Sequence, residues 1–213
     1  MNKLKLFSIT GIISLIIGCL FAEPLTYFLI TLLPKGIKFV AINPFDGFMI
    51  LMWVGFAISI AVFGFIFSVW AWWNYKDILY KKEKELIIKS LFPSSILFLF
   101  GLCFGMFLYL NIMLPFFLET NVGLGLENLW SMYNVIVTGL GLSIMLGFCF
   151  ELPLVVRGLI EVGLVTKQRL KENRGIVLFV VCLVSAVITP TPDLLSMFLV
   201  ALPLYGLFEV SLL

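Results

Sequence analysis

Glu151 is the residue of this chain that apolar packing explains least well. It follows 23 residues, 128–150, that carry no charge. A carboxylate inside a membrane costs several kcal/mol unless it is protonated, paired or hydrated, and such groups are often functional. Pro153 lies two residues further on, and a proline inside a helix removes a backbone donor and kinks the helix. A kink beside a carboxylate indicates a polar cavity, although a glutamate at a helix end can also simply reach the membrane surface.

Arg157 is the nearest cation in the sequence that could neutralise this carboxylate. Residues six positions apart lie roughly 120° apart around a helix, whereas helical neighbours are three or four positions apart. We therefore expect Glu151 to face a cavity rather than Arg157, and Glu161 remains an alternative partner for the arginine.

Two other acidic sites stand out. Glu83 and Glu85 lie in the most charged part of the chain, 76–85, where they are either solvated partners of the neighbouring lysines or ligands for a cationic partner. Asp193 directly follows Pro190 and Pro192. Two prolines prevent a continuous helix there. We expect Asp193 to cap the helix that begins after it, by accepting hydrogen bonds from free backbone N–H groups.

The composition places these residues in a membrane. The chain is 62% hydrophobic and 12% charged, whereas soluble domains carry about 25% charged residues. It contains no histidine, which excludes bis-histidine haem binding, HExxH metalloproteases and Ser-His catalysis. Its four cysteines lie in apolar runs without CxxC spacing and indicate buried packing. These absences remove the commonest catalytic groups without excluding an enzyme. We expect no enzyme activity, no metal, no cofactor and no nucleic-acid partner.

The apolar runs predict one all-α domain, 1–213, with six transmembrane helices. The expected spans are 6–33, 48–73, 90–118, 129–160, 175–189 and 194–213. The last two are short for a hydrocarbon core of about 30 Å. Lys and Arg residues number eleven in the segments on the N-terminal side of the membrane, against two in the outer loops. This asymmetry predicts that both termini are cytoplasmic.

Four segments in the same order resemble one family, the TatC family of the twin-arginine, Sec-independent protein translocase. They are Phe150–Pro153, Thr189–Asp193, Leu79–Lys84, which is similar to the family's LYxxER segment, and Ala201–Glu209. The resemblance covers essentially the whole chain. It implies a glove-shaped six-helix bundle with a concave, lipid-facing pocket.

The resemblance also implies a function. TatC-like proteins receive the twin-arginine signal peptides of folded cargo proteins at the cytoplasmic face. They act as homo-oligomers in a receptor complex with the single-span partners TatA and TatB, in contact with membrane lipid, and the proton-motive force drives transport. The expected location is the bacterial plasma membrane, with a thylakoid or mitochondrial inner membrane as alternatives.

Residue by residue, the resemblance assigns signal-peptide binding to Glu83 and, more weakly, to Glu85. From the residues themselves, we expect Glu151 and Glu209 to be polar docking points for a partner inside the membrane. Pro153, Pro190, Pro192 and Asp193 are expected to be hinge or capping residues. The chain departs from the family pattern at its start, which lies inside the family's ELRxR-type motif, and at Lys84, where arginine is usual.

Two other functions fit the sequence without the resemblance. A secondary transporter for a small solute or proton would use Glu151, Asp193 and Glu209 as a relay beside proline-broken helices. A structural membrane subunit would explain the short loops equally well. The six spans show no inverted repeat, which counts against the transporter, and the four matching segments favour the TatC-like function over both alternatives.

Overall fold

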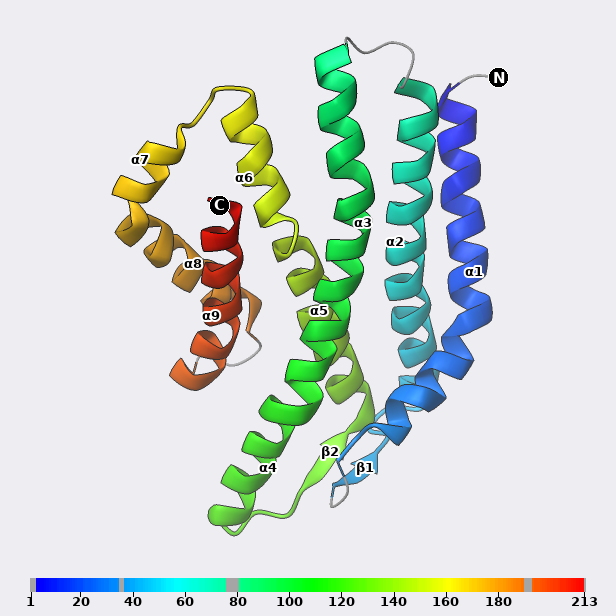
Figure 1. The fold of residues 1–213 in the computed structure, drawn as a ribbon. Helices are drawn as coiled ribbons and strands as arrows, with labels where there is room; N and C mark the ends of the chain where they lie inside the picture. The colour runs from blue at the N-terminus through cyan, green and yellow to red at the C-terminus, as the bar shows by residue number, and fades with distance from the viewer. Residues whose placement is uncertain (1–2, 35–36, 76–80, 190–192, 213) are drawn as a thin grey trace.

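The computed structural model describes residues 3–34, 37–75, 81–189 and 193–212, and their side chains at 8–34, 37–67, 93–189 and 193–212. The described chain is a helical bundle in which two small strands join the loops at one end (Figure 1). Its elements are α1 (Lys3–Thr31), β1 (Lys38–Val40), α2 (Asp46–Tyr75), α3 (Lys81–Leu108), the π-helix η1 (Tyr109–Met113), α4 (Leu114–Gly123), β2 (Leu129–Ser131), α5 (Met132–Cys149), α6 (Leu152–Glu161), α7 (Lys167–Glu172), α8 (Arg174–Ile188) and α9 (Leu194–Ser211).

Five helical segments of the described chain are long and apolar enough to cross a membrane, in agreement with five of the predicted spans. They are 8–31, 46–67, 93–123, 132–161 and 194–211. The remaining predicted span corresponds to α8, an apolar helix of 15 residues. At 1.5 Å per residue it is about 22 Å long, shorter than a hydrocarbon core of about 30 Å.

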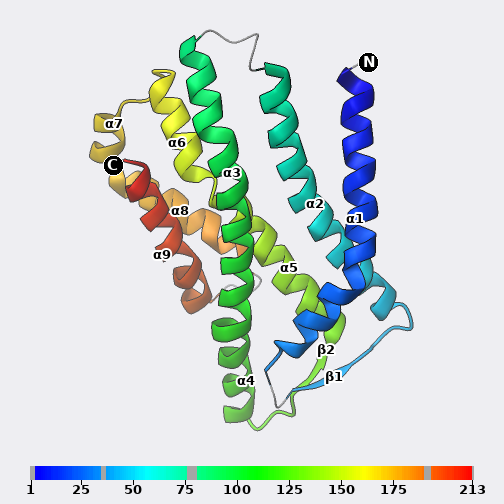
Figure 2. The ribbon, with the colours of Figure 1, turned by 45° about the vertical axis from the view of Figure 1, so that its right-hand side comes forward.

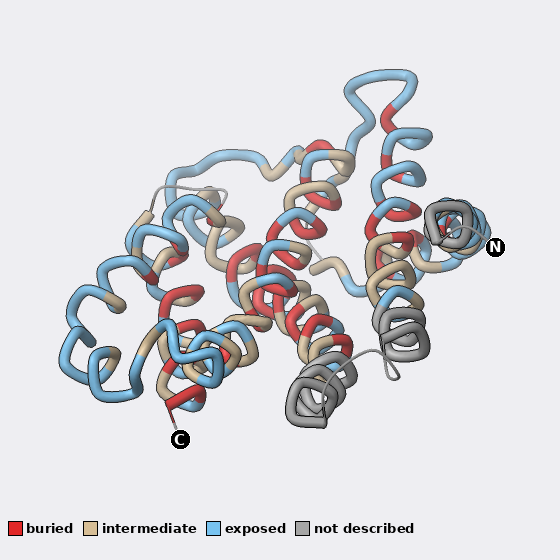
Figure 3. Tube along the Cα trace, turned by 90° about the horizontal axis from the view of Figure 1, so that it is seen from above, coloured by how far each residue is buried: buried red, intermediate tan, exposed pale blue. Residues whose placement is uncertain are grey.

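The helices form three groups that follow one another across the molecule (Figure 2). The first pair, α1 and α2, packs on α3 and α5, and α6, α8 and α9 lie on the far side. Seen from above, buried residues lie where the helices face one another, and exposed residues face outward (Figure 3). Apolar side chains such as Ile12, Phe28 and Phe179 are among the exposed ones. This is the pattern of helices that are solvated by lipid.

The predicted span 129–160 corresponds to the helical segment 132–161, with a later start and with an interruption where the Pro153 kink was expected. Its first residues form strand β2, and the helix then breaks at Phe150 and Glu151 into α5 and α6. Pro153 has no N–H with which to reach the carbonyl of Cys149, so α5 ends at that residue. The new helix starts when the N–H of Val155 bonds to the carbonyl of Glu151. The break therefore places Glu151 at a helix junction.

The third span ends later than the sequence suggested. The expected boundary was residue 118, with an outer loop at 119–127, whereas α4 continues as a helix to Gly123. Between α3 and α4, η1 forms a wide turn in which the N–H of Leu114 bonds to the carbonyl of Tyr109. Pro115 explains the turn, because it cannot donate to the carbonyl of Asn111 four residues back.

The strands β1 and β2 pair in parallel, with Lys38 opposite Leu129 and Val40 opposite Ser131. Sequence analysis predicted neither strand. They connect the loop after α1 to the loop before α5, at the end of the bundle opposite the start of α1 (Figure 1).

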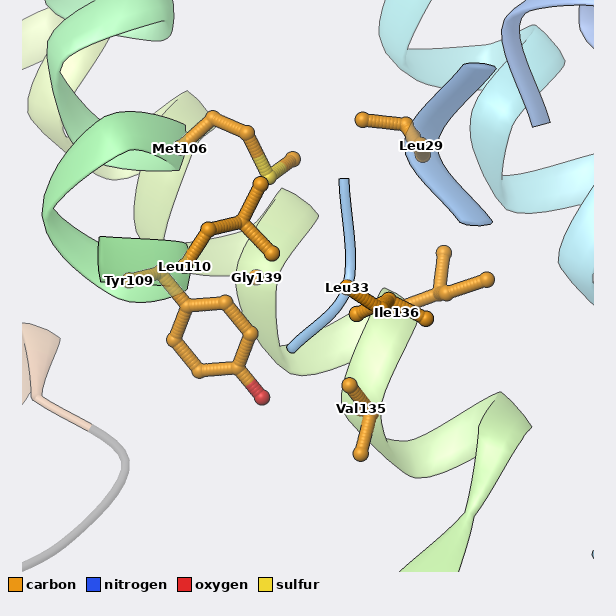
Figure 4. Close-up of a pocket in the computed structure, with 8 residues that line it drawn as sticks. All are labelled: Leu29, Leu33, Met106, Tyr109, Leu110, Val135, Ile136 and Gly139. Carbon is orange, nitrogen blue, oxygen red and sulfur yellow. The ribbon is translucent and has the colours of Figure 1, made fainter. Parts of the chain in front are cut away.

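Glycines allow the central helices to approach closely. A Cβ atom added to Gly101 would lie 2.8 Å from the Cα atom of Gly147, and one at Gly105 would lie 2.7 Å from the Cα atom of Ser143. The GxxxG pair of α3 therefore lies against α5, as expected for small residues at a membrane helix interface. Gly139 in turn leaves room for the ring of Tyr109, beside a cavity of about 10 Å³ between α1, α3, η1 and α5 (Figure 4).

Candidate polar docking site in the membrane

Glu151 occupies the junction between α5 and α6, and its carboxylate is bound by a serine from another helix. The hydroxyl of Ser94, on α3, lies 2.8 Å from both carboxylate oxygens. Both side chains are half-buried. Glu151, in the break between α5 and α6, thus faces α3. The kink and the Ser94 hydroxyl together fix the direction of its carboxylate.

A cavity of about 310 Å³ opens beside this pair. Glu151, Ser94 and Ser95 are its polar lining residues, and the rest of its wall is apolar, from α2, α3 and α5. A larger cavity of about 540 Å³ lies next along α2, lined by α1, α2, α3, η1 and α5. The two share Ala61 in their walls. Together they form an apolar recess that has a carboxylate at one end.

Arg157 does not contribute to this site within the described part of the chain. No ion pair joins it to Glu151 or to Glu161, and its side chain is exposed on α6. Sequence reasoning missed Ser94, the residue that does bind the carboxylate. Its only sequence signal is a hydroxyl in an apolar span, directly after Pro93, and that signal does not identify a partner 57 positions away.

Glu209 lies in a different environment. One of its carboxylate oxygens accepts a hydrogen bond from the guanidinium of Arg174 at 2.9 Å, and the other accepts one from the hydroxyl of Tyr205 at 3.0 Å. The Arg174 bond connects the start of α8 to the end of α9, and the Tyr205 bond lies within α9. Glu209 and Glu151 therefore have separate hydrogen-bond partners in the described part of the chain.

Asp193 is the N-cap residue of α9. Its Oδ1 atom accepts a hydrogen bond of 2.7 Å from the backbone N–H of Ser196, and its own backbone is extended. Pro190 and Pro192, the expected hinge residues, lie outside the described residues.

Replacing Asp193 by alanine should lower the free energy of unfolding by about 0.5–2 kcal/mol, because the N–H of Ser196 then loses its acceptor. Asp193→Asn should cost less, since the amide oxygen still accepts this bond. Thermal unfolding of the purified protein in detergent, followed by circular dichroism, measures both effects. Equal midpoints for the three proteins would contradict the capping role.

Glu83 and Glu85 belong to the first two turns of α3, where the side chains lie outside the described residues. The backbone still locates them. The start of α3 lies at the same end of the bundle as the start of α1 and the end of α6, away from the strands (Figure 1). Lys3, Lys5, Lys81 and Lys82 occur at these helix starts, so this end of the described bundle is rich in charge.

The described residues contain no group of three or more His, Cys, Asp or Glu side chains that could hold a metal ion. The Glu151 carboxylate can accept hydrogen bonds and pair with a positive charge.

Comparison with known proteins gives these features a context. The sequence profile of the family described as Sec-independent protein translocase protein (TatC) matches residues 2–203. A Sec-independent protein translocase protein TatC of Akkermansia muciniphila is 33% identical over 134 residues, which are 63% of this chain and 38% of that protein. The TatC protein of Haemophilus influenzae is 31% identical over 194 residues, 90% of this chain and 73% of that protein.

The fold is similar to a solved one over nearly its whole length. A crystal structure of the Twin Arginine Translocase Receptor TatC superposes with a TM-score of 0.72 at 27% identity, covering 99% of this chain and 95% of that chain. The predicted all-α, polytopic membrane fold is thus confirmed, as is the resemblance drawn from the four sequence segments. The chain belongs to the TatC family of Sec-independent protein translocase proteins and is a multi-pass membrane protein.

Proposed function

We propose that this protein is the receptor component of a twin-arginine translocase. In this function it binds the twin-arginine signal peptides of folded proteins at the cytoplasmic face, where both of its termini lie. With single-span partners of the TatA and TatB type, it then mediates export driven by the proton-motive force. The observation that carries the proposal is the likeness, over 99% of the chain, to a structure described as a twin-arginine translocase receptor.

Signal recognition is assigned to Glu83, with a weaker contribution from Glu85. Two adjacent guanidinium groups bind best to carboxylates that can accept paired, charge-assisted hydrogen bonds. The start of α3 supports this assignment because a helix fixes the backbone of Glu83 at the charged end of the bundle. A receptor site there is accessible to a peptide that has not yet entered the membrane.

Docking inside the membrane is assigned to Glu151 and Glu209. The recess beside Glu151 has apolar walls and one carboxylate. An apolar peptide segment or a partner helix gains dispersion contacts in such a recess, and a polar group on it gains a hydrogen bond that lipid cannot offer. Glu209 already has two partners, so a docking helix must compete with Arg174 there. Glu151 is therefore the stronger docking point.

Glu83→Gln should weaken binding of a twin-arginine signal peptide about fivefold. An exposed ion pair contributes up to about 1 kcal/mol, and about 1.4 kcal/mol is a factor of ten in affinity. Photo-crosslinking of a labelled signal peptide to the purified protein in detergent measures the effect. Added salt should reduce the wild-type signal, because part of the attraction is screened.

Two controls make this test specific. Glu85→Gln should have the smaller effect of the two variants, and a twin-lysine peptide should bind the wild type less well than the twin-arginine peptide. Unchanged crosslinking of Glu83→Gln, at an unchanged thermal midpoint, would remove Glu83 from the receptor site.

A further inference from the structure

The Glu151 carboxylate has acceptor capacity that its protein partner does not use. Two carboxylate oxygens offer about four lone-pair positions, whereas a serine hydroxyl donates a single proton. The Ser94 hydroxyl is shared between both oxygens at 2.8 Å, and no other described residue donates to them. A carboxylate in the membrane with so few donors is stabilised when a cation or another donor binds it.

Aromatic side chains surround the space that such a donor would occupy. Phe63 and Phe65 of α2, Phe98 of α3 and Phe148 of α5 line the cavity of about 310 Å³ that contains Glu151. The rings of Phe98 and Phe148 lie 5.1 Å apart, edge to face. The negative faces of aromatic rings attract ammonium and guanidinium groups, more strongly when the cation is desolvated. A carboxylate among phenylalanines is thus a combination that selects organic cations over neutral apolar groups.

No cation of the protein fills this position in the described part of the chain. Arg157, the nearest in sequence, is exposed and forms no ion pair with Glu151. Within the described residues, the Glu151 carboxylate thus has no cationic partner.

We propose that this cavity is a binding site for an ammonium or guanidinium group carried on an apolar stem. Glu151 is the counter-charge, the four phenylalanines line the space for the stem and the cation, and Ser94 is a positioning residue that holds the carboxylate toward the cavity. The biological ligand is then a basic side chain of a membrane-inserted peptide segment. This part of the inference rests on the proposed docking role of Glu151.

A thermal-shift titration with n-octylammonium tests the chemistry of the site without a peptide. The unfolding midpoint of the purified protein in detergent should rise saturably with n-octylammonium, because a ligand that binds only the folded state stabilises it. The neutral analogue n-octanol should produce little shift. Glu151→Gln keeps the size of the side chain and should reduce the apparent affinity for n-octylammonium about tenfold or more, as expected for loss of a charge-assisted hydrogen bond.

Ser94 variants test the positioning role separately. Ser94→Ala should weaken n-octylammonium binding, and Ser94→Thr, which retains the hydroxyl, should restore it. A purely structural serine would change the midpoint without ligand and leave the affinity for n-octylammonium unaltered. Lack of rescue by threonine would remove Ser94 from the site.

Two results would overturn the cation site itself: n-octanol stabilising the protein as much as n-octylammonium, or Glu151→Gln binding n-octylammonium as well as the wild type. Either result leaves the proposed function standing if a partner still crosslinks at Glu151. Loss of signal-peptide crosslinking in Glu83 variants, by contrast, bears only on the receptor function.

Discussion

Replacing Gly18 by valine is expected to destabilise the bundle more strongly than loss of the Asp193 cap. A Cβ atom at Gly18 would overlap the carbonyl oxygen of Gly55 and the hydroxyl of Ser59. The serine can rotate, but the carbonyl belongs to the backbone of α2 and cannot. The interface is equally close from the other side, since a Cβ atom at Gly55 would lie 3.3 Å from the carbonyl oxygen of Gly18.

The cost follows from the way membrane helices associate. Lipid is as apolar as the helix surface, so close packing of small residues, rather than hydrophobic burial, holds α1 against α2. Forcing extra methyl groups into a packed interface costs about 1–3 kcal/mol, and occasionally more. Because the backbone itself must move apart, we expect about 3 kcal/mol or more for Gly18→Val and a smaller loss for Gly18→Ala.

Gly11 provides the matched control on the same helix. A Cβ atom there has no neighbour within 4 Å, so Gly11→Val should leave the midpoint of thermal unfolding in detergent close to that of the wild type. Gly18→Val should lower it clearly. Similar midpoints for Gly11→Val and Gly18→Val would show that α1 and α2 do not pack closely in the detergent-solubilised protein.

Glu151→Leu is expected to abolish most partner docking while leaving the protein inserted. Leucine fills the space of the glutamate side chain with apolar atoms and removes the only carboxylate of the recess. Glu151→Gln retains the size of the side chain and accepts a hydrogen bond from Ser94, as the carboxylate does. If Glu151 is a polar docking point for a partner helix that carries a neutral polar group, the glutamine variant should keep much of its crosslinking to that helix, and the leucine variant should lose about tenfold.

Stability measurements separate docking from packing. Glu151→Leu leaves the Ser94 hydroxyl without its acceptor, which costs about 1–3 kcal/mol for a buried group and less for one that is half-buried. Helix content and insertion should nevertheless persist, because the α5 break depends on Pro153 rather than on the carboxylate. Wild-type crosslinking in the leucine variant would show that Glu151 is not a contact point.

The sequence alone determined the approximate positions of the membrane helices, of which five are long enough in the described chain to cross a membrane and the sixth is the short helix α8. An apolar run such as 48–73 shows by itself where a membrane helix lies. A helix satisfies its backbone hydrogen bonds internally and needs only enough apolar length to cross the membrane. The Asp193 cap is also local: its acceptor and the N–H of Ser196 lie three positions apart. Short motifs then identified the family.

The sequence could not determine what depends on contacts between distant segments. The β1–β2 pair joins residues about ninety positions apart, and three-residue strands carry no readable periodicity. The π-turn at Tyr109 could not be predicted either. The missing N–H of Pro115 does not by itself specify which backbone hydrogen bonds the helix forms instead. The helix through Glu119 was missed because hydropathy marks where the membrane ends, whereas the backbone continues to form hydrogen bonds beyond it.

Ser94 and Glu151 show the distinction most clearly. The sequence indicated that the carboxylate needed a partner, since an uncompensated charge in a membrane is costly. It did not indicate which of the polar residues supplied the partner. That choice was made by the packing of α3 on α5 through Gly101 and Gly105, which places Ser94 opposite the Pro153 break. Bond formation between distant residues follows from the geometry of the helix interface, and only the tertiary structure contains that geometry.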